Sequence, residues 1–299
     1  MSEVRRHPSI LFGYSDVMAS RSHSRAPRRR RARPLTFKST RRFIRLWFRA
    51  FRKTVAAYPL PVRFLVSGVI ILLVWASVNW VYHAINKPTE VFFALDDTLD
   101  KRPPETWRQY GPLFRTHSTS VITPELLAAL AQVEGGGNPV ARTYWRWRLT
   151  RNPLELYQPA SSAVGMYQIT DGTFREAKRY CIHDHVVTQD GPWQDMKSCW
   201  FNALYTRVVP SHAIELTAAL LDRNVASALT HQRLAPATFK RKQDLAAVIH
   251  LCGAAAGNAY ATHGFRLTPN QRCGDHDVRN YLARVNAMKD QFARLAVAG

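Results

Sequence analysis

One uninterrupted apolar segment constrains this chain more than any other feature. Residues 64–82 carry no formally charged side chain, and this length is close to the ~20 residues that a helix needs to cross a bilayer. Trp75 and the aromatic residues at 80–82 lie towards its C-terminal end, where an interfacial belt is expected. We therefore predict a single transmembrane signal-anchor helix over residues 61–84. The long preceding segment argues against a cleaved signal peptide.

The positive charge of the chain is concentrated before this segment. Of the net charge of +21, +14 falls in residues 1–60, which hold 16 Lys/Arg and 2 Asp/Glu. Basic residues flanking an apolar span mark its cytoplasmic side, which predicts a membrane protein with a cytoplasmic N-terminus and an exported C-terminal domain. Charge confined to one tail argues against specific nucleic-acid binding.

The basic segment of residues 1–60 is predicted to be largely disordered, because it contains an Arg run at 28–31 and few aliphatic residues. Residues 41–53 differ, since aromatic and aliphatic side chains alternate there with basic ones. This stretch fits a basic amphipathic helix lying on an anionic membrane surface. A solvated tail without a specific partner is the alternative.

All cysteines lie beyond the apolar segment, in the part that is predicted to be exported. An even number of cysteines in such a region predicts two disulfides formed in an oxidising compartment. Sequence proximity favours the pairs Cys181–Cys199 and Cys252–Cys273 among the three possible pairings. Metal ligation is the competing interpretation, but the spacings are not those of a CxxC site.

The exported region divides into two parts. Residues 85–120 contain several prolines and no clear periodicity, so we predict a stalk. Residues 121–299 show helical patterns, beginning with the start signal Thr123-Pro124-Glu125 and continuing with apolar residues at helical spacing. Alternating strand patterns are scarce, which predicts a mainly α domain.

Glu134 is the most informative polar residue of that domain. It follows Leu130 by four residues and Leu127 by seven, so it lies on the apolar side of its helix. A carboxyl group held against apolar side chains favours its protonated form, which suits a general acid. The glycines at 135–137 are expected to leave space for a polymer to approach. An ion-paired glutamate that ends a helix is the alternative.

Two motifs together resemble one family. Residues 134–139 read Glu-Gly-Gly-Gly-Asn-Pro, similar to the Glu-Ser-x-x-Asn-Pro motif of the soluble-type lytic transglycosylases, relatives of goose-type lysozyme. Residues 161–169 resemble the Ala-x-Gly-x-x-Gln-Ile segment of the same family. The resemblance covers roughly residues 121–290 and implies a lysozyme-like α domain. Together with the apolar helix, it implies a bacterial inner-membrane protein whose catalytic domain (121–299) is periplasmic.

The resemblance also implies a reaction. Glu134 would protonate the bond between N-acetylmuramic acid and N-acetylglucosamine. The resulting carboxylate would then accept a proton from the muramic C6 hydroxyl, which gives a 1,6-anhydro end. No cofactor is implied. The substrate-binding residues that the two motifs imply are Asn138, Ser162, Gly165, Met166, Tyr167 and Gln168.

The chain departs from the family pattern at two places. Gly135 stands where relatives often have Ser, and Ser162 is a candidate to replace that hydroxyl. A third family motif, Ala-Tyr-Asn-Ala-Gly, aligns loosely with residues 249–253, where His250 takes the place of Tyr. His250 is predicted either to bind Glu134 or substrate, or to be a buried structural histidine. Tyr260 is a second candidate for the missing tyrosine.

Several features leave alternatives open. Aromatic residues at 144–157 suit either sugar stacking or apolar packing. The His/Asp tracts at 183–185 and 275–277 favour loops over a metal site. Predicted partners are peptidoglycan glycan strands and the membrane, with an envelope or secretion complex also compatible. The rivals to a transglycosylase are a hydrolytic muramidase, with Glu155 or Asp171 as second carboxylate, and a non-catalytic peptidoglycan-binding component.

Overall fold

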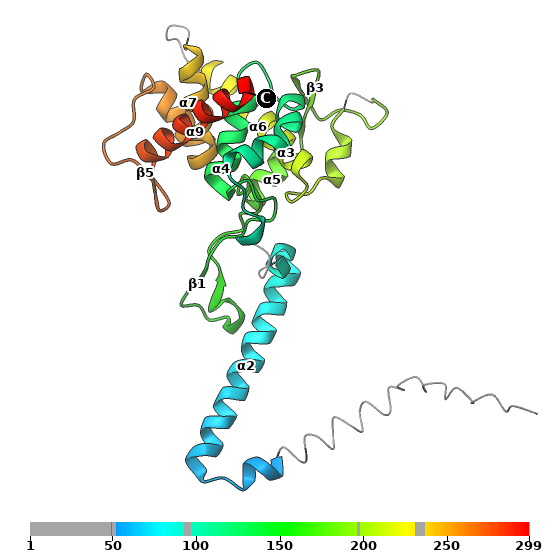
Figure 1. Ribbon diagram of the computed structural model, residues 1–299, viewed down its shortest axis with the longest axis vertical. Coiled ribbons are helices and arrows are strands. Elements are labelled where there is room, and N and C mark those ends of the chain that lie inside the picture. Colours follow the sequence, from blue (N-terminus) through cyan, green and yellow to red (C-terminus); the bar gives the residue numbers. More distant parts are fainter. Residues whose placement is uncertain (1–48, 50–51, 93–96, 196–197, 231–236, 299) are drawn as a thin grey trace, which may run out of the picture. The chain divides into compact units, whose positions relative to one another are not determined.

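The computed structural model describes residues 49, 52–92, 97–195, 198–230 and 237–298 (Figure 1). The basic segment that is predicted to be disordered lies outside the described residues up to position 48, as does most of the amphipathic stretch 41–53. The chain divides into two compact units, Met1–Gly68 and Val69–Gly299.

The predicted apolar helix is confirmed as α2, Leu60–Asn86. Only 6% of its most apolar window is buried, so it is not the core helix of a soluble domain. Large apolar side chains such as Ile71 and Leu72 are more than half exposed. Among the described residues it is the one helix that is long and apolar enough to cross a membrane.

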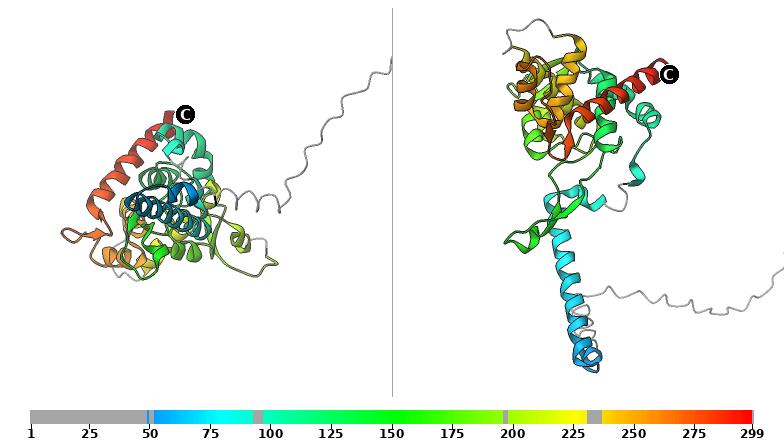
Figure 2. Two further views of the ribbon diagram at one scale, coloured as in Figure 1. Left: turned by 90° about the horizontal axis from the view of Figure 1, so that it is seen from below. Right: turned by 90° about the vertical axis from the view of Figure 1, so that its left-hand side faces the viewer.

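The rest of the described chain is mainly helical, as predicted (Figures 1 and 2). The principal helices after α2 are α3 (Pro103–Thr116), α4 (Pro124–Gly135), α5 (Asp171–Ala177), α6 (Pro210–Thr230), α7 (Phe239–Cys252), α8 (Ala254–Thr262) and α9 (Val278–Ala298). A lysozyme-like arrangement of these helices stays a prediction.

Helix α4 lies at the centre of the hydrophobic core. Thr123 caps it by accepting a hydrogen bond from the Leu126 N–H, and Pro124 occupies the first turn, where no N–H donor is needed. Each residue from 126 to 131 is at most 1% exposed. This segment packs against α3 and α9, and side chains of α6, α7 and α8 complete the same core.

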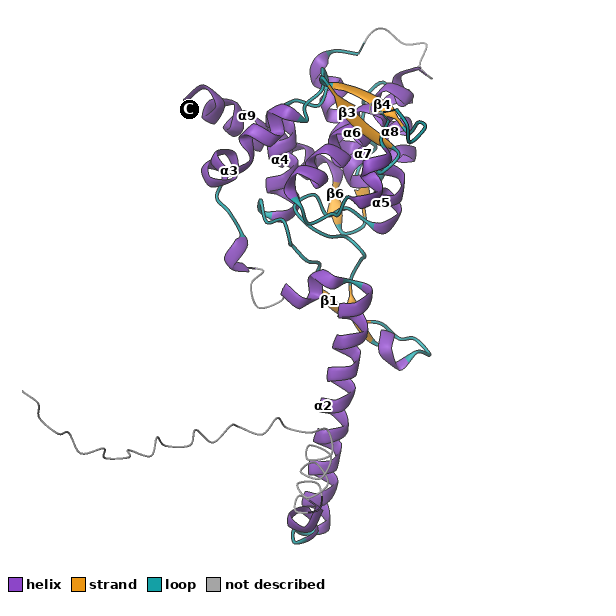
Figure 3. Cartoon of the chain, turned by 90° about the vertical axis from the view of Figure 1, so that its right-hand side faces the viewer, coloured by secondary structure: helices purple, strands orange, loops and turns teal. Residues whose placement is uncertain are grey.

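Strands occur only as three short antiparallel pairs in the described part of the chain (Figure 3). The pairs are β1 (Trp145–Trp147) with β2 (Tyr157–Pro159), β3 (Tyr180–His183) with β4 (Val186–Gln189), and β5 (Arg272–Cys273) with β6 (His276–Asp277). Short 3-10 turns are η1 (Pro88–Phe92), η2 (Asp97–Leu99), η3 (Pro153–Glu155) and η4 (Trp200–Leu204).

The predicted stalk over residues 85–120 is wrong for its second half. Helix α3 belongs to the folded domain, because Trp107, Tyr110 and Phe114 recur at helical spacing and Phe114 is completely buried. The prolines at its start obscured this pattern. They occupy the first helical turn, and the Glu105 carboxylate accepts a hydrogen bond from the Arg102 N–H at 3.1 Å.

The predicted cysteine pairing is confirmed. Cys181–Cys199 joins β3 to the segment before η4, and Cys252–Cys273 joins the end of α7 to β5, each with a Cα–Cα distance of 5.4 Å. The second bridge lies two residues beyond His250 along the chain, so it restrains the end of the helix that carries this histidine.

Candidate active site

Glu134 lies in the last turn of α4, and its side chain is 15% exposed. The Tyr281 hydroxyl, from α9, donates a hydrogen bond to Glu134 Oε1 at 2.5 Å. His250 Nε2, from α7, lies 3.9 Å from the same oxygen. Three helices therefore bring one carboxylate, one phenol and one imidazole together inside the domain.

The buried surroundings fix the protonation of both partners. Burial, reinforced by the negative charge of Glu134, raises the pKa of Tyr281 well above its ordinary value, so this hydroxyl keeps its proton. Burial lowers the pKa of His250, although Glu134 and a backbone hydrogen bond at Tyr167 oppose the shift. Near neutral pH the site thus holds one carboxyl group beside a phenol donor and a neutral imidazole.

The three glycines after Glu134 serve the packing of the chain itself. A Cβ at Gly135 would lie 2.8 Å from Met166 Cα, and one at Gly137 would collide with the Thr106 hydroxyl. Gly136 ends α4 with φ of 58°, the left-handed conformation that favours glycine. The expected space for a polymer at residues 135–137 is therefore wrong, because neighbouring parts of the protein fill most of it.

The second motif forms a tight turn that packs on Gly135. Gly165 has φ of 79°, and an added Cβ would lie 2.5 Å from the Arg207 carbonyl oxygen. Gln168 Nε2 donates to the carbonyls of Ala141 and Gly165, at 3.2 and 3.0 Å. Its amide nitrogen therefore holds the turn closed, and among the described residues its hydrogen-bond partners do not include Glu134.

Three residues that were predicted to bind substrate have fully buried side chains. Asn138, Met166 and Tyr167 are 0%, 0% and 1% exposed. Asn138 donates to Asp100 at 3.1 Å, and the Tyr167 hydroxyl donates to the Leu127 carbonyl at 3.1 Å. The prediction is wrong for direct contact by these side chains, because the core and the turn already occupy them.

The two hydroxyl candidates have contacts with residues other than Glu134. Ser162 Oγ accepts a hydrogen bond from the Asp171 N–H at 3.2 Å, at the start of α5. Tyr260 is 7% exposed and packs edge to face against Phe265. Tyr281 is instead the tyrosine beside Glu134. The helical spacing of Tyr281 in the sequence predicts a core residue. No neighbouring residue indicates that its hydroxyl would contact Glu134.

A small cavity of about 60 Å³ adjoins this cluster, with Tyr167, Gln168 and His250 among its lining residues. It is well below the ~300–1,000 Å³ of typical ligand pockets, so a glycan would have to lie across the surface. In the part of the chain that the structure describes, no group of three or more His, Cys, Asp and Glu side chains is placed to hold a metal ion.

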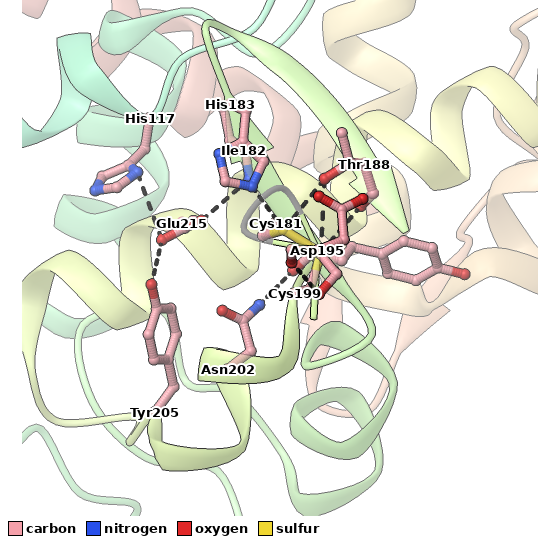
Figure 4. Close-up of a disulfide and its surroundings, with 12 residues drawn as sticks. His117, Cys181, Ile182, His183, Thr188, Asp195, Cys199, Asn202, Tyr205 and Glu215 are labelled. Carbon is pink, nitrogen blue, oxygen red and sulfur yellow. Dashed lines mark hydrogen bonds and ion pairs between the residues drawn. A yellow bond between two sulfur atoms is a disulfide. The ribbon is translucent and has the colours of Figure 1, made fainter. Parts of the chain in front are cut away.

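A second buried glutamate lies in α6 beside the Cys181–Cys199 bridge (Figure 4). Glu215 Oε1 accepts a hydrogen bond from the Ile182 N–H at 3.0 Å, and Oε2 accepts one from the Tyr205 hydroxyl at 2.8 Å. His117 Nδ1 lies 3.8 Å from Oε2. Burial lowers the pKa of His117, with opposition from Glu215. No motif or spacing in the sequence singles out this residue.

Comparisons with protein-family models, with curated proteins and with solved structures find no match for this chain.

Proposed function

We propose that this protein is a membrane-anchored lytic transglycosylase that cleaves peptidoglycan glycan strands, with Glu134 as its general acid and base. The observation that carries the proposal is the setting of this carboxyl group. It is 15% exposed, receives one hydrogen bond from Tyr281 and lies 3.9 Å from a histidine with a lowered pKa. A largely desolvated carboxyl group with a fixed donor suits proton transfer to a glycosidic oxygen.

The proposed reaction needs only one carboxyl group. Glu134 gives its proton to the leaving O4 of N-acetylglucosamine as the bond from C1 of N-acetylmuramic acid breaks. The muramic C6 oxygen then bonds to C1, and its proton passes to Glu134, which restores the acid. The substrate acetamido group stabilises the positive transition state, as in substrate-assisted glycosidases. Tyr281 positions Oε1 throughout.

Hydrolysis with inversion is the rival, and it requires a second carboxylate that activates water. Asp171 is paired with Arg207 at 2.8 Å, and Glu155 accepts a hydrogen bond from Asn152 at 3.0 Å. Both candidate carboxylates are therefore engaged by other side chains, which favours the single-acid reaction.

The proposed location follows from α2 and the disulfides. A helix with little buried surface suits a membrane span, and two disulfides suit an oxidising compartment. The basic flank of the helix favours a cytoplasmic N-terminus and a periplasmic helical domain. We extend the proposal to an inner-membrane anchor that holds the enzyme close to the peptidoglycan, alone or within an envelope or secretion complex.

Digestion of purified sacculi by the full-length protein tests this function. Mass spectrometry of the released fragments should reveal 1,6-anhydro ends, and Glu134→Gln should release them at least about 100-fold more slowly. Reducing ends in place of anhydro ends would identify a muramidase. Binding to sacculi without any cleavage by either protein would identify a non-catalytic binding component.

A further inference from the structure

The hairpin of residues 144–160 does not contribute to the hydrophobic core. It consists of β1, η3 and β2, and the residues buried in the core do not include any of its members. Several of its large side chains are uncovered, since Tyr144 is 63%, Trp147 69% and Leu149 100% exposed. A hairpin with such side chains needs a partner to cover them.

One face of α2 holds this hairpin in place. Trp75, Asn79 and His83 follow one another at intervals of four, so they line one face of the helix. Trp75 Nε1 donates to the Pro153 carbonyl at 3.0 Å, and Asn79 Nδ2 donates to the Tyr157 carbonyl at 2.8 Å.

A third polar contact and one ring contact complete this attachment. His83 Nε2 lies 2.9 Å from the Leu154 carbonyl oxygen, which can only accept. The Trp75 ring stacks with Trp147, at 6.0 Å between centroids. Asn79 and His83 are only 2% and 7% exposed, so the hairpin covers these polar side chains of an otherwise mostly apolar helix.

The height of this attachment places the bonded part of the hairpin below the membrane surface on the domain side. If the membrane surface lay at Trp75, the apolar run below it, from Phe64 to Val74, would rise only about 16 Å at 1.5 Å per residue. The hydrocarbon core is about 30 Å thick. The span must therefore continue past Trp75, and Pro153 is bonded at that level. Backbone carbonyls in that region need donors, which the α2 side chains supply.

The charges and the shape of the hairpin suit phospholipid. Arg146, Arg148 and Arg151 are exposed around Leu149, and these side chains can reach lipid phosphates while Leu149 enters the apolar layer. Between α2 and the hairpin lies an open, mostly apolar hollow of about 790 Å³, which is large enough for an acyl chain. Its lining includes Leu73, Trp75, Trp80, Val81, Trp145 and Tyr157.

We propose that the hairpin of residues 144–160 is a second membrane-contacting element, inserted into the leaflet on the domain side, with its arginines extending towards anionic headgroups. The inference rests on the proposed membrane span of α2. With α2 and the hairpin both in the membrane, the chain has two attachments to one bilayer. These attachments restrict the tilt of the segment that carries the hairpin.

Site-specific fluorescence in the full-length chain tests whether the hairpin of residues 144–160 contacts the membrane. The native cysteines are disulfide-bonded, so Leu149→Cys supplies a free thiol for an environment-sensitive dye. The protein is reconstituted into vesicles of phosphatidylethanolamine and phosphatidylglycerol that contain nitroxide-labelled lipid. Ile71→Cys, in α2, and the exposed Val297→Cys, in α9, provide the lipid-facing and water-facing references.

We expect the dye at position 149 to be quenched at least about twofold more than the dye at position 297, as an interfacial apolar side chain should be. Replacing Arg146, Arg148 and Arg151 by Gln should reduce this quenching and leave position 71 unchanged. Quenching at 71 together with a position 149 that behaves like 297 would overturn the hairpin inference alone. No quenching at 71 would overturn the membrane span as well. A dye at 149 that responds to soluble glycan fragments and not to lipid would assign the hairpin to sugar binding instead.

Discussion

Glu134, which is partly buried, and Glu215, which is buried, have nearly the same kinds of neighbour but differ in how many of their carboxylate oxygens are hydrogen-bonded. Each accepts a hydrogen bond from a tyrosine, Tyr281 or Tyr205, and each lies just under 4 Å from a histidine. Each cluster also lies near one disulfide. Glu215 additionally accepts a backbone N–H, so both of its oxygens are bonded.

Glu134 has one oxygen bonded to Tyr281, and its other oxygen has no donor among the described residues. Its side chain is 15% exposed, against 8% for Glu215. A carboxyl group with a remaining acceptor site can exchange a proton with a substrate, whereas a fully bonded one contributes to stability. The comparison therefore favours Glu134 as the reactive group of the proposed enzyme and Glu215 as a structural one.

The largest effect is expected when each glutamate is changed to glutamine. Glu134→Gln should lower the rate of sacculus cleavage by about 10²–10⁴-fold, the usual contribution of general acid–base catalysis. Because Gln still accepts from Tyr281, its thermal unfolding should change little. Glu215→Gln should leave one buried donor unpaired and cost about 1–3 kcal/mol of unfolding free energy. Equal losses of activity per folded molecule in both variants would abolish the distinction.

Removing the disulfides should give the next largest effect. Replacing Cys181 and Cys199 by Ser, or Cys252 and Cys273 by Ser, should lower the free energy of unfolding by about 2–4 kcal/mol in each case. Only the second pair adjoins the helix end that carries His250, so only its loss should also slow cleavage. Denaturant unfolding and fragment release measure the two effects, and slower cleavage after loss of the first pair would contradict this assignment.

Removing one tyrosine hydroxyl tests the same comparison and should have a smaller effect. Tyr281→Phe should slow cleavage by about tenfold, because a hydrogen bond to a charged group is worth about 1.5–3 kcal/mol and part of it is made in every state. Tyr205→Phe should instead lower the midpoint of thermal unfolding and leave the cleavage rate of the folded protein unchanged. A Tyr281→Phe protein with full activity would show that this hydroxyl only packs the helices.

A fall in pH is expected to have the smallest effect on the free energy of unfolding. Burial lowers the pKa of both His117 and His250 below the ordinary value of 6.5. The unfolded chain then binds more protons than the folded one just below pH 6.5, so stability is retained above this value and lost as the pH falls through it.

Single substitutions separate the two histidines. His117, which faces Glu215 and His212, and His250, which faces Glu134, should each contribute to this loss. Replacing either by Asn should flatten the pH dependence of the unfolding free energy, and only the His250 variant should change the pH profile of cleavage. A pH dependence that is identical in all three proteins would assign it to other groups.

Much of the local structure could be predicted because it depends on neighbouring residues. The apolar run that became α2, the start of α4 at Thr123 and the helical spacing of Leu127, Leu130 and Glu134 are all read within a few turns of chain. Short sequence separation also favoured the two disulfides, which the structure confirms. Helix α3 was missed because its prolines resemble a linker until the burial of Phe114 is known.

The sequence by itself determined that this protein has a membrane-length apolar helix, a mainly α domain, and a glutamate on the apolar side of its helix. Only the tertiary structure decided which groups meet that glutamate. Tyr281 is 147 residues away along the chain, and it reaches Glu134 because α9 packs across α4. The same holds for Gly135, whose missing side chain matters only because the Met166 backbone lies against it. Periodicity is a property of one segment, whereas a contact requires two segments to be packed in a particular register.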